Sequence, residues 1–131
     1  MNPEELKKRT KDFALRTMDL VENFPKTMTA SIIGRQVVRS ATSVGGNYRS
    51  ARRARSHADF ISKINIALEE ADESAYWLEL ARDKGLVSGE AAAQLLKEAN
   101  ELTAIFMSSV KTARKRHQRP GSSIVRLLTR S

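Results

Sequence analysis

Four long segments of this chain repeat apolar residues at three- and four-residue spacing, the period of a helix that buries one face. The pattern predicts helices over residues 3–24, from 27 or 29 to 54, from 57 to 84, and from 88 to a basic run at 111–116. Short links between helices of this length predict an all-α fold, specifically an antiparallel up-down four-helix bundle. The seams are rich in alanine and poor in aromatic residues, so self-assembly would bury additional apolar surface.

Residues with strong preferences for helix ends mark the expected boundaries. Asn2 and Ser56 are favoured N-caps, and Gly85 suits the left-handed conformation that ends many helices. We expect the bundle to span residues 1–117. Residues 118–131 are expected to form a basic, weakly ordered tail, with a short docking helix as the alternative.

The pair Gly45-Gly46 is the weak point of the second predicted helix, because each glycine costs about 1 kcal/mol relative to alanine. We expect a bent but continuous helix at this position. A true break in the helix is the alternative.

Charge is distributed unevenly along the chain, whose formal net charge is +8. Residues 1–56 carry a net charge of +7, residues 57–84 carry −4, residues 85–110 carry −2, and residues 111–131 carry +7. Clustered positive charge attracts and holds phosphates, so this distribution favours a polyanionic partner, RNA or DNA. The alternative is a basic protein whose charge serves only solubility.

The composition narrows the expected environment of the protein. The chain has no cysteine, which excludes disulfides and thiolate metal sites. Its first residues are charged, unlike a secretory signal, and no window approaches the roughly 18 apolar residues of a membrane span. We therefore expect a cytoplasmic protein with no membrane span.

Two groups of arginines in the second predicted helix have different expected partners. Antiparallel pairing about a turn near residues 55–56 places Arg39 level with Glu73 and Arg35 near Trp77. The arginines nearer the turn face a stretch in which only Asp59 is acidic, so they remain available for phosphate, which arginine binds bidentately. The candidate nucleic-acid contacts are Arg49, Arg52, Arg53, Arg55, Lys111, Arg114, Lys115 and Arg116.

The same region carries a recognisable sequence motif. The residues concerned are Arg39-Ser40-Ala41, Ser43-Val44, Asn47, Ser56, Asp59-Phe60 and Ile66-Ala67. They resemble the four-helix bundle proteins of intervening sequences in bacterial 23S rRNA genes, which are similar in fold to the accessory protein of diversity-generating retroelements. The resemblance implies an up-down subunit, often a cyclic homopentamer, with basic surfaces suspected of binding nucleic acid and no enzymatic activity. Arg49-Ser50-Ala51 replaces the family's usual Ala-Glu-Gly, so no role of that glutamate carries over.

Asn47 and Trp77 are the candidate assembly residues, together with Arg39 and Glu73. A polar residue at a helix seam usually bonds to adjacent backbone and fixes the register of the helices, which we expect of Asn47; contact with a nucleic-acid base is the alternative. Trp77 is expected at a subunit interface or an edge of the core, because aromatic residues are enriched at interfaces.

Catalytic and metal-binding chemistry is not expected from this sequence. A di-iron bundle needs Glu-x-x-His motifs, and the chain has none. His57 and His117 lie near helix ends and belong to no motif with the spacing of metal ligands, and no inward carboxylate pair is evident. We expect no enzyme, no cofactor and no metal. The predicted function is nucleic-acid binding by a homo-oligomer, with an accessory subunit that docks a partner enzyme such as a reverse transcriptase as the alternative.

Overall fold

A computed structural model describes residues 1–118 of the chain and confirms the predicted all-α fold. Its helices are α1 (Pro3–Glu22), α2 (Met28–Arg52), α3 (His57–Asp83) and α4 (Gly89–Gln118). The described residues contain no strand. Apart from Gln118, the predicted tail at 118–131 lies outside the described residues.

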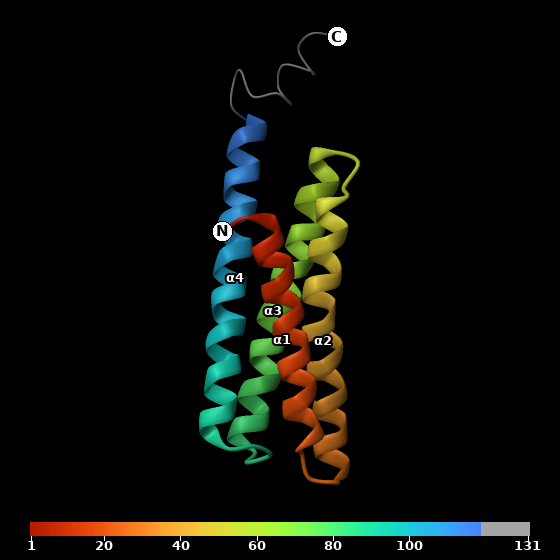
Figure 1. The fold of residues 1–131 in the computed structure, drawn as a ribbon, viewed down its shortest axis with the longest axis vertical. Helices are drawn as coiled ribbons and strands as arrows, with labels where there is room; N and C mark the ends of the chain where they lie inside the picture. The colour runs from red at the N-terminus through yellow and green to blue at the C-terminus, as the bar shows by residue number, and fades with distance from the viewer. Residues whose placement is uncertain (119–131) are drawn as a thin grey trace.

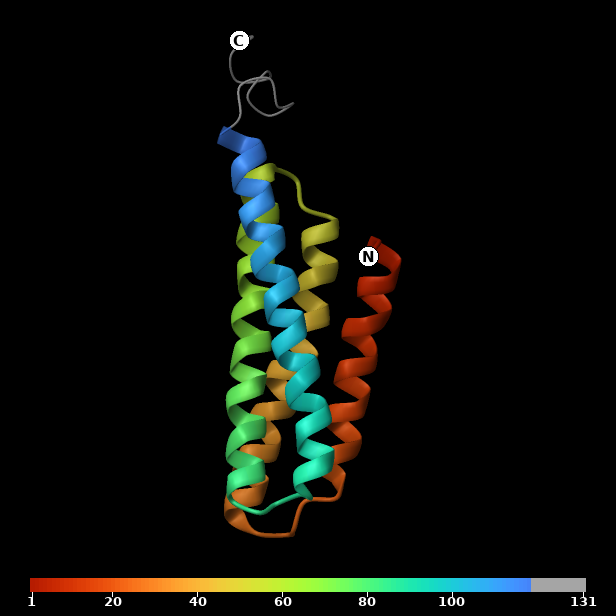
Figure 2. The same cartoon turned by 90° about the vertical axis from the view of Figure 1, so that its left-hand side faces the viewer.

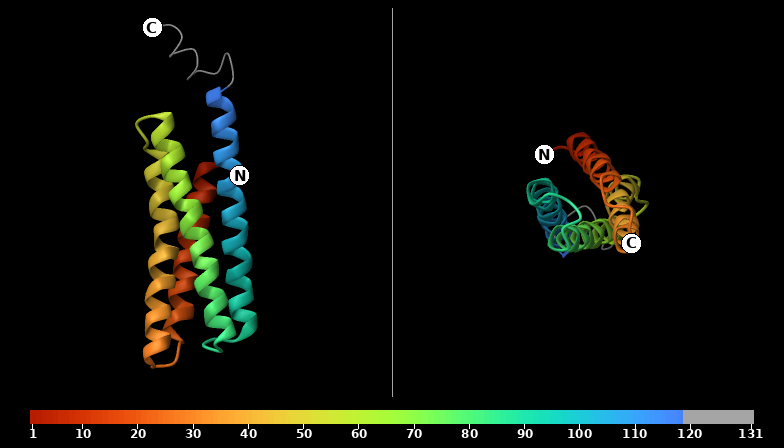
Figure 3. Two further views of the ribbon diagram at one scale, coloured as in Figure 1. Left: turned by 180° about the vertical axis from the view of Figure 1, so that it is seen from behind. Right: turned by 90° about the horizontal axis from the view of Figure 1, so that it is seen from below.

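The three connections alternate between the two ends of an elongated molecule (Figure 1). The α1–α2 and α3–α4 links lie at one end, and the α2–α3 link lies at the other end, beside the last turns of α4 (Figure 2). The main packing is of α2 on α3 and of α3 on α4, whereas α1 packs chiefly on α2 and only lightly on α4. The end-on view shows the resulting separation of α1 from α4 (Figure 3).

Side-chain caps explain where the helices begin. Asn2 accepts a hydrogen bond from the Glu5 amide at 2.8 Å, and the Glu5 carboxylate accepts one from the Asn2 amide, which completes a capping box. Ser56 caps α3 by accepting from the Asp59 amide at 3.0 Å. Gly85 has φ of 76°, the left-handed conformation that the sequence predicted for the end of α3.

Two predicted boundaries were too long. The predicted first helix reached residue 24, but α1 ends at Glu22, and Phe24 instead turns its buried side chain into the core before Pro25. The predicted second helix reached residue 54, but α2 ends at Arg52. It runs without a break through Gly45 and Gly46, so the alternative of a true break is wrong.

The core consists of apolar side chains contributed by all four helices. The largest fully buried apolar side chains are Phe13, Val37, Val44, Ile64, Leu78, Leu102 and Phe106. The alanines predicted to line the third helix are buried, so neighbouring helices can approach it closely. Ser40 and Ser74 are also fully buried, and the Ser74 hydroxyl donates to the Ser40 oxygen at 2.9 Å. This bond satisfies polar groups that would otherwise be costly to bury.

The helical glycines predict a graded stability series. A Cβ at Gly46 would meet nothing within 4 Å, so Gly46→Ala should stabilise the protein by about 0.5–1 kcal/mol through improved helix propensity. At Gly34 the Cβ would lie 2.9 Å from Val21 Cγ1, so Gly34→Ala should destabilise by about 1–3 kcal/mol. Gly45→Ala should fall between them, because its Cβ would lie 3.2 Å from Thr10 Oγ1. Urea unfolding measures the order, and equal shifts at all three sites would contradict it.

Two partly buried ion pairs of Arg9 join α1 to α4. Arg9 donates to both oxygens of Glu98, at 2.8 and 2.7 Å, and also to Glu101 at 2.5 Å. The hydrogen bond to Glu98 raises the pKa of Arg9, and together with the charges of Glu98 and Glu101 it outweighs the opposing effect of burial, so the guanidinium stays protonated. The Glu98 side chain is only 13% exposed, which makes it dependent on this partner.

Removal of the Arg9 guanidinium should lower the stability of the protein measurably. Arg9→Leu should lower the free energy of unfolding by about 1–3 kcal/mol, because Glu98 then loses its charged hydrogen-bond partner. Lys8→Leu is the matched control, since Lys8 pairs with Asp12 on the surface, where such pairs contribute about 0–1 kcal/mol. Denaturant midpoints compare the two variants. An effect of Lys8→Leu as large as that of Arg9→Leu would contradict the assignment.

Candidate nucleic-acid interface

The structure brings two basic segments that are distant in sequence to the same end of the molecule. Residues 49–55 end α2 and form its link to α3, and residues 111–116 lie in the last turns of α4, beside that link (Figure 2). A hydrogen bond of 2.8 Å between His57 Nε2 and the carbonyl oxygen of Ala113 ties the start of α3 to α4. We call this part of the molecule, residues 46–63 and 105–118, the basic end.

The basic end has little negative charge to offset its cations. It contains nine lysine and arginine residues and a single acidic residue, Asp59. All eight predicted nucleic-acid contacts are exposed, and none forms an ion pair with a carboxylate in residues 1–118. These contacts are Arg49, Arg52, Arg53, Arg55, Lys111, Arg114, Lys115 and Arg116.

The opposite end differs in charge. Its two links with their adjoining turns, residues 19–31 and 79–98, contain four lysine and arginine residues and six aspartate and glutamate residues. Charge is therefore distributed unevenly along the length of the molecule, with positive charge concentrated where α2, α3 and α4 meet. Such a field orients an approaching polyanion toward one end.

A groove between α1 and α2 extends the positive surface, which the sequence interpretation missed. Lys7, Lys11 and Arg49 line it together with Gly45 and Gly46. Lysines four residues apart share a helix face, and the exposed Gly46 leaves the groove unobstructed. The spacing of the two lysines and the glycine pair indicate this groove only once the packing of α1 against α2 is known.

The predicted pairing of Arg39 across the α2–α3 seam is present. Its guanidinium forms ion pairs with Glu70, at 3.2 Å, and with Glu73. Glu73 also accepts a hydrogen bond of 3.2 Å from the half-buried indole of Trp77, which packs at the edge of the core. Arg35, which the pairing placed near Trp77, forms no ion pair with a carboxylate within residues 1–118.

Asn47 bonds to the backbone, as expected, but within its own helix. Its side-chain amide donates to the carbonyl oxygen of Ser43 at 2.9 Å, within α2 itself. No side-chain hydrogen bond from Asn47 to another helix occurs in the described residues, so Asn47 does not fix the helix register in that way. The buried Ser40–Ser74 bond crosses between α2 and α3 instead.

Tyr48, which precedes Arg49 in the basic end, is a core residue. Its ring is 5% exposed and lies 5.9 Å from that of Phe106, measured between centroids. Burial raises the pKa of the Tyr48 hydroxyl, an effect that the positive charge of Arg52 partly opposes. A buried ring of this kind is not available to stack on bases.

The described residues contain no group of three or more histidine, cysteine, aspartate or glutamate side chains that could hold a metal ion. Within the same residues, no helix is long and apolar enough to cross a membrane. The site offers exposed guanidinium and ammonium donors at one end of the packed helices.

The architecture and the site define an all-helical four-helix protein with one strongly basic end. The family model described as 23S rRNA-intervening sequence protein matches residues 4–108, and the chain belongs to that family, as the sequence indicated.

Among solved structures, the chain is similar to a protein of unknown function from the S23 ribosomal protein family of Bacteroides thetaiotaomicron. The two are 34% identical, and the match covers 85% of this chain and 99% of the other with a TM-score of 0.78. No curated protein is detectably similar to the chain.

Proposed function

We propose that this protein is a non-enzymatic nucleic-acid-binding bundle of the cytoplasm that holds RNA or DNA phosphates at its basic end. The observation that carries the proposal is the meeting of residues 49–55 and 111–116, whose eight exposed cations have no carboxylate partner in residues 1–118. Unpaired cations crowded in this way repel one another, and phosphates relieve that repulsion.

The proposed mode of binding is backbone recognition. Arginine offers a planar fork that matches a phosphate, and lysine adds a mobile point charge. No aromatic side chain among the eight contacts provides a stacking platform, so affinity should depend strongly on salt and weakly on base sequence.

We further propose that up-down bundles of this chain assemble into a homo-oligomeric ring, a pentamer in keeping with the family resemblance. The alternation of the three connections between the two ends supports the up-down arrangement (Figure 1). The Arg39–Glu73 pair and Trp77 lie together on the outer side of the α2–α3 pair, where they suit a subunit contact.

The test begins with the purified full-length protein. Its absorbance ratio at 260 and 280 nm reports co-purifying nucleic acid, and anisotropy of labelled RNA and DNA oligonucleotides at two salt concentrations reports affinity. We expect tight binding at low salt that weakens steeply as salt rises. Absence of binding at low salt would refute the nucleic-acid function, and a strictly monomeric mass by light scattering would refute the ring.

A further inference from the structure

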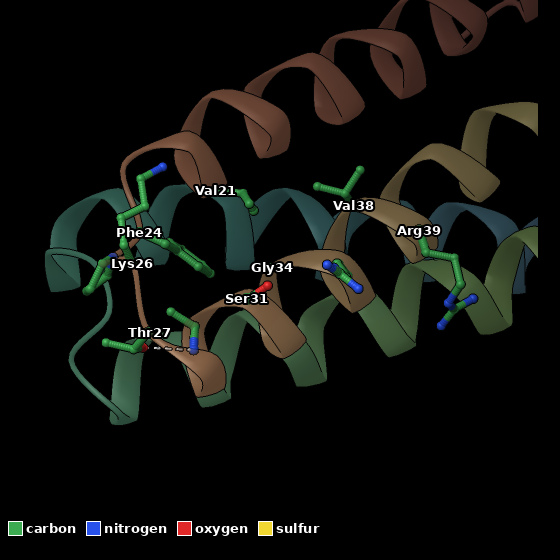
Figure 4. A pocket seen from close by; sticks show the side chains of 11 residues that line it. Val21, Phe24, Lys26, Thr27, Ser31, Gly34, Val38 and Arg39 are labelled. Carbon is green, nitrogen blue, oxygen red and sulfur yellow. Dashed lines mark hydrogen bonds between the residues drawn. The ribbon is translucent and has the colours of Figure 1, made fainter.

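A second surface lies far from the basic end, where α1 turns into α2 (Figure 4). It is a hollow of about 700 Å³ lined by residues of the 21–39 segment. Val21 and Phe24 form one wall, and Ala30 and Val38 contribute apolar surface from α2. Gly34 lets this wall form, because Val21 and Phe24 pack directly against its backbone.

The charge around this hollow has one sign. Lys26, Arg35 and Arg39 line it, and no aspartate or glutamate does. Arg39 is already paired with Glu70 and Glu73 across the α2–α3 seam. Lys26 and Arg35 are exposed and form no ion pair with any carboxylate in residues 1–118, so they are available to an anionic group that enters beside the apolar wall.

Two further apolar side chains are exposed on the turns of α2 that line the hollow. The side chains of Met28 and Ile32 are 80% and 55% exposed, and their four-residue spacing places them on one helix face. Exposed apolar side chains next to a hollow of this kind mark interaction surfaces. A hollow between two helices with exposed apolar side chains on the same turns suits an amphipathic segment laid along α2.

We propose that the hollow and the adjoining face of α2 dock an acidic amphipathic helix of a partner protein. Leucine-like anchors of that helix occupy the hollow against Val21 and Phe24, and its carboxylates face Lys26 and Arg35. Charge complementarity selects this occupant over a neutral or basic helix. The inference goes beyond nucleic-acid binding, because the α1–α2 link lies at the opposite end from the basic end and both surfaces can be occupied together (Figure 1).

The experiment uses the full chain and a fluorescein-labelled peptide of about 16 residues with leucines at helical spacing and glutamates elsewhere. Anisotropy is read at about 150 mM salt, where exposed charges alone bind weakly. Two variants change the hollow: Ser31→Trp fills it, and Arg35→Glu reverses a cation. Ser31 is suitable because it is exposed and its hydroxyl makes no hydrogen bond in residues 1–118. The matched controls on α4 are Gln94→Trp and Lys97→Glu, both at exposed positions outside the hollow.

We expect Ser31→Trp and Arg35→Glu each to weaken peptide binding by about tenfold or more, with the α4 controls within about twofold of the parent. A peptide with serine in place of leucine should bind at least about tenfold more weakly than the original. Equal binding of the two peptides would overturn the proposal, because charge alone would then explain the binding. An unchanged affinity for Ser31→Trp would overturn it as well.

Two further results would assign the hollow to a different occupant and so overturn the proposal. One is self-association of the parent protein that Ser31→Trp abolishes in light scattering, which would make the occupant a second copy of the chain. The other is binding of dodecanoate that Ser31→Trp blocks while the peptide fails to bind, which would make the site one for small amphiphiles. Oligonucleotide affinity, measured in parallel, reports the basic end separately, and the helical circular-dichroism signal shows that each variant is folded.

Discussion

Replacement of Arg49, Arg52, Arg53 and Arg55 by glutamine should weaken nucleic-acid binding by on the order of a hundredfold and flatten its dependence on salt. Each phosphate contact that is lost lowers the slope of log K against log salt by about 1, so four contacts should lower it by about 4. The expectation rests on the exposure of these side chains and on their lack of carboxylate partners in residues 1–118. Anisotropy of a labelled oligonucleotide over a salt series measures both quantities.

A charge-matched control separates the site from the net charge. Arg16, Lys26, Lys84 and Lys97 are exposed cations outside the basic end, and their replacement by glutamine removes the same charge. We expect this control to keep nearly all of the salt slope, because general attraction falls off over a Debye length of about 8–10 Å. Equal slopes in the two quadruple variants would show that the basic end is not the binding site.

A second large effect is expected in the core. Phe13→Ala should lower the free energy of unfolding by about 3–5 kcal/mol, the cost of a cavity in place of a fully buried ring. Phe13 is the largest fully buried side chain of α1, the helix that packs only lightly on α4. We therefore expect the amides of α1 to lose protection from hydrogen exchange before those of α3.

Leu15→Ala on the same helix is the control for Phe13→Ala. Leu15 is 48% exposed, so the substitution should change stability by less than about 0.5 kcal/mol. Urea denaturation with a circular-dichroism readout compares the two variants. A loss of less than about 1 kcal/mol in Phe13→Ala would mean that α1 contributes little to the cooperative core.

Much of the fold was predictable because its determinants are local. The three- and four-residue apolar spacing located four helices. Asn2 and Ser56 accept the backbone hydrogen bonds expected of N-caps, and Gly85 adopts the left-handed conformation expected after a helix. The pairing of Arg39 with Glu73 followed from a turn near residue 55 and the equal rise of two facing helices.

The candidate sites were less predictable, because each joins residues that are distant in sequence. The cations at 49–55 and at 111–116 were recognised one by one, but their meeting depends on how α4 packs beside the α2–α3 link. The groove that adds Lys7 and Lys11 requires α1 to lie against Gly45 and Gly46. For Asn47 only the kind of partner, a backbone carbonyl, was predictable, because the sequence does not reveal which carbonyl its side chain reaches.

The sequence by itself determined the four helices, the caps at Asn2 and Ser56, the uneven charge and the family, because apolar spacing, capping and sequence motifs are properties of short segments. Tertiary structure alone decided that two basic segments share one end, that Arg9 joins α1 to α4, and that Phe24 and Arg35 border a hollow at the other end. These features depend on side-chain packing between helices, which periodicity constrains to a face but not to a particular neighbour.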